Sequence, residues 1–262
     1  MGNYWQAKRG QGMVVEVRGI PVNYICYGEG PETAVILQGW GTNAGLYKDL
    51  AAHLGQAMRV YVPELPGFGA TPEPPEAWGA EEYAAFTLEL LEALGIRETH
   101  LIGHSNGGRI MLVLASKPRE VKFGKLVFLD AAGVVPKPTA KKKLRAALYK
   151  IGKFFLSPFP KALEAWRQKR GSADYRAASP LMRQTLVKLV NRDLTDLMPL
   201  IPNPSLLIWG EKDADTPLWM GKVFEEHIPD AGLVTVPGAG HYAYLEQPRF
   251  VFRVLDSFFG GN

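Results

Sequence analysis

The sequence predicts an α/β fold, in which crossover helices join the strands of a mostly parallel sheet. Over most of the 262 residues, short apolar runs rich in β-branched residues alternate with segments of helical periodicity, which is typical of this class. Central runs such as residues 35–37 and 206–208 are continuously apolar, as strands buried on both faces are. Residues 133–204 lack a strand pattern, and we expect them to contain an insertion.

Eight strands are expected. In chain order they are residues 13–18, 21–27, 34–38, 59–63, 100–103, 125–130, 205–209 and 233–236. Because only Gly19 and Ile20 separate the first two, these predict an antiparallel hairpin at the edge of the sheet.

Helices are expected to flank this sheet. Residues 81–94 place Ala84, Leu88 and Leu91 at helical spacing and are followed by Gly95, which suits a helix end. Residues 105–115, 218–227 and 248–259 also have helical patterns. Together, strands and helices predict an eight-stranded sheet flanked by helices.

The insertion is helical in pattern and contains eight prolines. Insertions that follow the carboxyl ends of strands lie over the ligand crevice. We therefore expect a helical cap segment, residues 134–204, on a core formed by residues 1–133 and 205–262. Residues 137–198 hold 15 Lys and Arg but 4 Asp and Glu, a net charge of +11, whereas the rest of the chain carries −7.

Composition favours a cytoplasmic protein without metal or cofactor. No apolar run approaches the roughly 20 residues of a membrane span, and the first ten residues lack the apolar core of a secretory signal. The single cysteine, Cys26, has no disulfide partner and is expected to be a buried strand residue. No Cys/His cluster of zinc spacing or phosphate-binding loop is present, and nothing indicates nucleic acid as a partner.

The strongest functional signal is a serine between two glycines. Residues 103–107 read Gly-His-Ser-Asn-Gly, between a strand pattern and a helix pattern. On such a turn the serine is strained and exposed, and the start of the helix places its positive dipole end near a developing oxyanion. Ser105 is therefore the candidate nucleophile.

A serine nucleophile requires a base, which must be one of five histidines. His53 and His227 lie in predicted helices, and His100 begins a strand. His104 is expected to point away from Ser105 and to be packed or hydrogen-bonded. His241 follows the last predicted strand in a glycine-containing loop, which makes it the candidate base.

The acid that orients this base is expected in the loop after the seventh strand. Residues 211–217 contain Glu211, Asp213 and Asp215. We expect Asp213 to be the acid. Asp215 is the alternative, and its other interpretation is a cap for the helix that begins near Pro217.

Two backbone N–H groups are expected to bind the oxyanion. One belongs to Asn106, directly after the nucleophile. The other is expected from residues 38–42, Gln-Gly-Trp-Gly-Thr, whose glycines allow close approach. We expect Trp40 to be this donor, and Gly39 and Trp40 to contact the substrate.

These pieces together resemble the α/β-hydrolase superfamily over nearly the whole chain except the cap segment. The matching stretches, in the family's order, are residues 38–41, 65–69, 103–108, 210–217 and 240–241. The resemblance implies a Ser105, Asp213 and His241 triad with Trp40 and Asn106 as oxyanion donors. Two residues depart from the usual pattern, Gln38 in place of His and Glu64 in place of Asp.

The expected activity is hydrolysis of a small-molecule carboxylic ester or thioester through an acyl-enzyme, by a serine hydrolase of the carboxylesterase type. A carrier-bound or otherwise anionic substrate is one option, which the basic cap segment suggests. The alternatives are a carbon–carbon bond hydrolase, an aminopeptidase, and a non-catalytic ligand-binding protein on the same scaffold. Serine at residue 105 argues against the similar haloalkane dehalogenases and epoxide hydrolases. The motifs do not identify the acyl chain or the oligomeric state.

Overall fold

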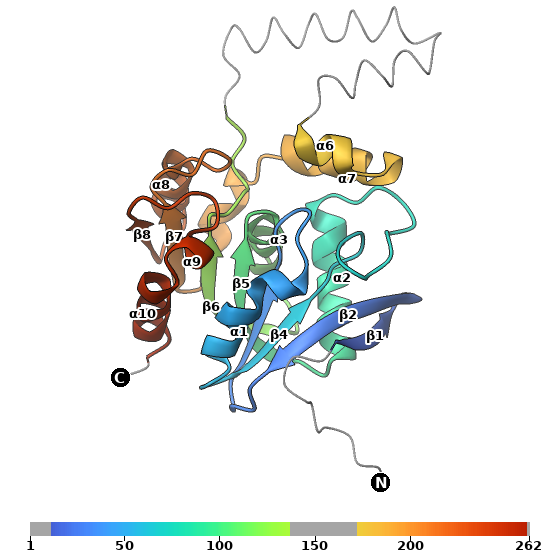
Figure 1. Cartoon of the computed structure of the whole chain (residues 1–262), viewed down its shortest axis with the longest axis horizontal. Helices are drawn as coiled ribbons and strands as arrows, with labels where there is room; N and C mark the ends of the chain where they lie inside the picture. The colour runs from blue at the N-terminus through green and yellow to red at the C-terminus, as the bar shows by residue number, and fades with distance from the viewer. Residues whose placement is uncertain (1–11, 137–171, 261–262) are drawn as a thin grey trace, which may run out of the picture.

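A computed structural model describes residues 12–136 and 172–260 of the chain (Figure 1). Its sheet has eight strands in the order β1-β2-β4-β3-β5-β6-β7-β8. The β1 and β2 strands form the predicted antiparallel hairpin at the edge, β2 pairs antiparallel with β4, and all further pairs are parallel. The strands are β1 (Met13–Val17), β2 (Ile20–Tyr27), β3 (Thr33–Leu37), β4 (Arg59–Pro63), β5 (Glu98–His104), β6 (Lys122–Leu129), β7 (Ser205–Gly210) and β8 (Ala231–Val236).

Helices cover both faces of this sheet. One face packs against α2 (Ala80–Ala93), α3 (Asn106–Ala115) and α8 (Leu218–His227). The other face packs against α1 (Lys48–Leu54), preceded by the 3-10 helix η1 (Ala44–Tyr47), and against α10 (Pro248–Phe259), preceded by α9 (Ala243–Glu246). Successive residues of a strand point to opposite faces of the sheet, so Leu101 packs into the first core and Ile102 into the second. Because both faces are covered, the central strands are apolar without interruption. The predicted three-layer arrangement is confirmed.

Three strands begin two or three residues earlier than the sequence predicts. We expected starts at His100, Lys125 and Leu233, whereas β5 begins at Glu98, β6 at Lys122 and β8 at Ala231. In β6 the first four residues are exposed or half-buried and the last four are buried. Polar strand beginnings at the rim of the sheet carry no apolar signal, so periodicity detects only the buried carboxyl-terminal halves.

The described part of the predicted cap segment contains helices. It contains α6 (Ala173–Ala177), α7 (Pro180–Asn191) and the 3-10 helix η2 (Thr195–Leu200), and α6 and α7 lie beyond the end of α2 in Figure 1. Trp78 N–H donates to Thr185 Oγ1 over 3.1 Å, and Arg109 Nη1 donates to Arg192 O over 3.2 Å. These bonds tie α7 and its following turn to the core. Residues 137–171, which hold most of the Lys and Arg residues counted in this segment, lie outside the described residues.

Across the described ranges, every helix is too short or too polar to cross a membrane.

Candidate active site

Ser105 lies on a strained turn between β5 and α3. Its backbone has φ 49° and ψ −112°, in the left-handed half of the map that side chains other than glycine rarely adopt. Hydrogen bonds fix this turn, because Ser105 N–H donates to Leu129 O over 3.0 Å and Ser105 O accepts from Ala132 N–H over 2.9 Å. The serine is therefore held at the carboxyl end of β5 and against the end of β6.

The glycines around Ser105 have a steric reason. A Cβ atom on Gly107 would lie 2.0 Å from Leu37 O, and one on Gly103 would lie 2.4 Å from Met111 Sδ. Such contacts are far below van der Waals distance. Glycine at these positions lets α3 start directly against β3 and β5, which is what the strand-to-helix turn requires.

Asp213 and His241, predicted from separate loops, are brought together. Asp213 Oδ2 lies 2.9 Å from His241 Nδ1, and Asp213 is buried while His241 is half-buried. Asp213 also accepts the N–H groups of Asp215 and Thr216 at Oδ1, over 2.8 and 2.9 Å, and the Thr216 hydroxyl at Oδ2, over 2.6 Å. The side chain of the alternative acid, Asp215, is exposed.

This geometry defines the protonation of the pair. A carboxylate can only accept, so His241 Nδ1 carries the proton, and in the neutral imidazole Nε2 is left bare. Burial lowers the pKa of His241, but the hydrogen bond to Asp213 and its negative charge outweigh burial, and the pKa lies above its ordinary value. Burial raises the pKa of Asp213, yet the hydrogen bonds from His241 and Thr216 hold that pKa below its usual range.

Backbone contacts hold the acid loop (residues 211–217) against the base loop (residues 237–242). Lys212 N–H donates to Ala239 O over 2.8 Å, and Gly210 approaches Gly240 so closely that a Cβ would lie 2.0 Å from Gly240 O. Asp130, at the end of β6, accepts from Gly210 N–H over 2.7 Å and from Ala243 N–H over 3.2 Å. One buried carboxyl thus joins the residue before the acid loop to the residue after the base loop, and burial raises the pKa of this carboxyl to about 7.

The predicted oxyanion loop (residues 38–42) lies against Ser105. A Cβ on Gly39 would lie 3.3 Å from Ser105 Cβ. Gln38 Nε2 donates to Thr42 O over 2.7 Å and closes the loop, and the Trp40 ring packs edge-on against Phe68 at 5.0 Å. Among the described residues, no hydrogen bond uses the backbone N–H of Trp40 or Asn106.

Three residues near the site were not recognised from the sequence as part of it. Of these, only Glu64 was mentioned, as a departure from the usual family pattern. Asp130 ends an apolar strand with a carboxylate, and that pattern could have identified it. Glu64 accepts the N–H groups of Ala44 and Ala70, over 3.0 and 2.7 Å, so it joins the segment after the oxyanion loop to the turn at residues 65–69. Tyr47, which accepts Gly39 N–H over 2.8 Å, gave no sequence signal.

A possible metal site within the described residues coincides with the candidate triad. Potential ligand atoms of Asp213, Asp215 and His241 lie within 4.8 Å of one another. The facing atoms of Asp213 and His241 are hydrogen-bonded to each other. This hydrogen bond uses the atoms that would bind a metal ion, and it suits proton transfer.

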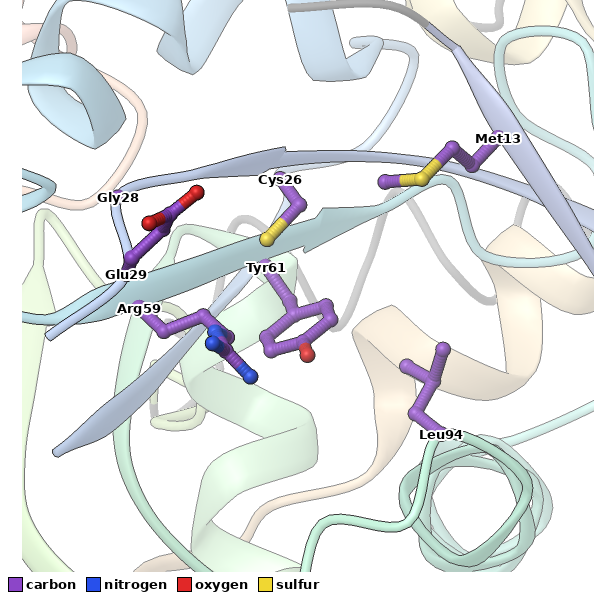
Figure 2. Close-up of a pocket in the computed structure, with 7 residues that line it drawn as sticks. All are labelled: Met13, Cys26, Gly28, Glu29, Arg59, Tyr61 and Leu94. Atoms are coloured by element: carbon purple, nitrogen blue, oxygen red, sulfur yellow. The ribbon is translucent and has the colours of Figure 1, made fainter. Parts of the chain in front are cut away.

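Cys26 lies in a different pocket, at the β2 and β4 strands. Figure 2 shows its side chain directed into this cavity of about 330 Å³, toward Tyr61 and Arg59. The residue is buried, as expected. Burial also raises the pKa of its thiol, although the nearby Arg59 charge opposes this. A protonated thiol is a poor nucleophile, so Cys26 does not compete with Ser105.

Comparison with known proteins identifies the family. The chain matches the alpha/beta hydrolase family over residues 34–254. A pimeloyl-(acyl-carrier protein) methyl ester esterase from Chromobacterium violaceum is 28% identical over 87% of this chain and 94% of its own length. A 2-hydroxy-6-oxononadienedioate/2-hydroxy-6-oxononatrienedioate hydrolase from Paraburkholderia phymatum is 28% identical over 91% of both chains.

Solved structures agree on the fold. A hydrolase from Pseudomonas aeruginosa PA01 superposes with a TM-score of 0.74 at 24% identity, and the match covers 97% of this chain and 100% of that one. Since the family match spans most of the chain, and the similar proteins are named as esterases and hydrolases, the chain belongs to the alpha/beta hydrolase family and is a hydrolase.

Proposed function

We propose that this chain is a serine hydrolase that cleaves carboxylic esters or thioesters through an acyl-enzyme, with Ser105, His241 and Asp213 as its triad. The observation that carries the proposal is the partly buried hydrogen bond between Asp213 and His241, which leaves Nε2 of the neutral imidazole bare. A strained serine on a tight turn, a base and an orienting carboxylate are the groups that nucleophilic acyl transfer requires.

The reaction has two halves. Ser105 Oγ attacks the acyl carbon while its proton passes to His241 Nε2, and Asp213 stabilises the imidazolium that forms. The tetrahedral intermediate expels the alcohol or thiol, which takes the proton from Nε2. Water then attacks the acyl-enzyme, gives a proton to Nε2 and releases the acid, and the proton returns to Ser105.

The oxyanion binds to the backbone N–H groups of Trp40 and Asn106 in this proposal. Support comes from their lack of other acceptors among the described residues, and from the approach of Gly39 to Ser105. Each such donor contributes about 3 kcal/mol to transition-state binding. Gly39 and the Trp40 indole would contact the acyl group, and residues 134–204 would form a cap over it.

A small-molecule ester or thioester, free or carrier-bound, is the proposed substrate. The relatives from Chromobacterium violaceum and Aeromonas hydrophila are both named as esterases of a carrier-protein-linked methyl ester. These names support an ester as the substrate. Carbon–carbon bond hydrolysis is the second candidate, because other relatives are named as hydrolases of 2-hydroxy-6-oxononadienedioate or 2-hydroxymuconate semialdehyde. A panel of p-nitrophenyl esters, thioesters and 2-hydroxy-6-oxo acids distinguishes the two.

Covalent labelling tests the nucleophile. An organophosphonate should label one serine, Ser105, and Ser105→Ala should abolish both labelling and ester hydrolysis, a loss on the order of 10⁶-fold in kcat. Peptide mapping locates the adduct, and the thermal unfolding midpoint checks that the variant is folded. If the Ala variant is labelled as strongly as the parent, Ser105 is not the nucleophile. That result would favour the alternative of a non-catalytic ligand-binding protein.

A further inference from the structure

The imidazole of His104, the residue before the candidate nucleophile, lies between the oxyanion loop and the base loop. It is 1% exposed, with Nδ1 3.0 Å from the Tyr47 hydroxyl and Nε2 2.9 Å from the backbone carbonyl of His241. The Tyr47 hydroxyl in turn accepts Gly39 N–H over 2.8 Å. Four groups thus form one chain of hydrogen bonds across the site.

The direction of every hydrogen bond in this chain can be assigned. A carbonyl only accepts, so His104 Nε2 must carry the proton that faces His241 O. Burial lowers the pKa of His104 to about 3, so the imidazole is neutral and its Nδ1 is bare. Nδ1 therefore accepts from Tyr47, whose oxygen accepts from Gly39. The Thr42 hydroxyl, 3.1 Å from the Tyr47 oxygen, donates to Gly39 O over 2.9 Å.

The surroundings keep these groups in place. Tyr47 stacks on Tyr244 with ring centroids 5.4 Å apart and planes 11° apart. The His104 ring also contacts Tyr242 and Tyr244, at 5.0 and 5.3 Å. A Cβ on Gly39 would lie 2.7 Å from His104 Nδ1, so the oxyanion loop rests directly on the imidazole. A shift of His104 would be transmitted to both loops.

We propose that His104 and Tyr47 are positioning residues that set the oxyanion loop and the base loop at the correct distance from each other. The Tyr47 hydroxyl fixes the Gly39 peptide and so aims the next N–H, that of Trp40. The His104 Nε2–H fixes the backbone carbonyl of His241 and so places its side chain. This inference rests on the proposed function, since it assumes that Trp40 N–H binds the oxyanion and that His241 is the base.

Two conservative substitutions separate the two hydrogen bonds of His104, one with the Tyr47 hydroxyl and one with the backbone carbonyl of His241. In His104→Asn, the amide oxygen reaches the place of Nδ1 and can still accept from Tyr47, but the link to His241 O is lost. In His104→Gln, the amide nitrogen reaches the place of Nε2 and can still donate to His241 O, but the link to Tyr47 is lost. Tyr47→Phe removes both the acceptor of Gly39 N–H and the donor to His104, and it changes the packing least.

A matched control is His100→Gln. His100 lies on the same strand, with its ring half-buried, and its Nδ1 accepts Lys125 N–H over 2.9 Å at the opposite end of β5. This variant reports what the loss of a half-buried, hydrogen-bonded histidine of β5 costs in stability alone. Its kcat should stay within about twofold of the parent, because it touches neither loop.

The leaving group distinguishes the two links. Damage to the oxyanion loop slows all esters alike, whereas a misplaced base slows alkyl esters more, because an alkoxide needs a proton and p-nitrophenolate does not. Tyr47→Phe and His104→Gln should therefore lower kcat for p-nitrophenyl and ethyl esters equally, by about 10- to 100-fold. His104→Asn should lower kcat for the ethyl ester further. KM should change less than about twofold in each.

Each outcome decides between the proposal and its failure. If the folded variants keep the kcat of the parent, or lose activity only through KM, the positioning role is wrong. If His104→Asn and His104→Gln respond alike to the leaving group, the two links are not separate and the proposal fails in that form. Organophosphonate labelling of the parent protein is measured alongside the kinetics of these variants. An unlabelled parent refutes the proposed function, while a labelled parent with unaffected variants refutes only this inference.

Discussion

The two halves of the candidate site are held in different ways. Side-chain hydrogen bonds hold the acid–base half, where Asp213 accepts from two backbone N–H groups, one hydroxyl and the imidazole. Backbone hydrogen bonds and close glycine contacts hold the nucleophile half. There Ser105 has φ 49°, and Gly107 lies where any Cβ would collide with Leu37 O. Across the described residues, the Ser105 side chain makes no hydrogen bond.

This difference follows from what each half must do. The acid and base must keep one tautomer and one charge distribution, which directional hydrogen bonds to a buried carboxylate provide. The nucleophile must leave its hydroxyl available to a substrate, so its position is set through the main chain instead. Substitution of the residues that hold each half in place should therefore change different quantities: turnover in the acid–base half, and folding stability in the nucleophile half.

Among the residues that hold the two halves in place, the largest effect is expected from Asp213→Asn. An amide at this position no longer stabilises the imidazolium and disturbs the tautomer that accepts the serine proton, so kcat should fall on the order of 10⁴-fold. Asp215→Asn is the control. Its carboxylate is exposed and only its backbone N–H contacts Asp213, so kcat should stay within about threefold. Steady-state kinetics on one ester measures both, and a reversed ranking would make Asp215 the acid.

Gly107→Ala should break the nucleophile half through stability. The added methyl would lie 2.0 Å from Leu37 O, a backbone atom that cannot rotate away, and the free energy of unfolding should fall by about 3 kcal/mol. Gly232→Ala in β8 is the matched control, because nothing lies within 4 Å of its added Cβ. Urea unfolding measures both variants. Equal midpoints would mean that close approach at Gly107 is not a constraint.

The pH profile sharpens the acid–base half. The pKa of His241 is raised above its ordinary 6.5, and the imidazolium cannot accept the serine proton. We therefore expect kcat/KM to fall about tenfold per unit as pH drops below a midpoint that lies above 6.5. In Asp213→Asn the midpoint should move to lower pH, because burial, which lowers the pKa of His241, is then opposed only by the smaller effects of the Asp130 and Asp215 charges. A midpoint that does not move would separate Asp213 from the titrating group.

The sequence allowed features that depend on neighbouring residues to be predicted, whereas most contacts between residues far apart in the chain could not be predicted. The strand cores, the hairpin, the insertion and the serine turn follow from periodicity and glycine spacing within a few residues. The hydrogen-bonded state of His104 was also expected. Its partners were not, because Tyr47 and His241 lie 57 and 137 positions away in the chain. Tertiary folding alone brings such groups together, as it brings Asp130 to Gly210 and Ala243.

Charge is also distributed unevenly within the predicted cap segment. Residues 172–198, which the structure describes, hold four Lys and Arg and three Asp and Glu. Of these, Arg192 pairs with Glu81 and Asp196. Residues 137–171 lie outside the described residues and hold 11 Lys and Arg against one acidic residue, which accounts for nearly all of the excess charge. Lys141, Lys142 and Lys143 form the densest run.

The smallest effect is expected from removing this run. If the positive charge attracts an anionic substrate carrier, association should be faster for a coenzyme A thioester than for a neutral ester of the same acyl chain. Salt screens exposed charge over about 10 Å at 0.1 M. The kcat/KM of the parent for the thioester should therefore fall several-fold from low to high salt, while that for the neutral ester stays constant. Lys141/Lys142/Lys143→Gln should remove most of this salt dependence. Identical salt responses for the two substrates would mean that the lysines take no part in substrate capture, because a steering field acts only on a charged ligand.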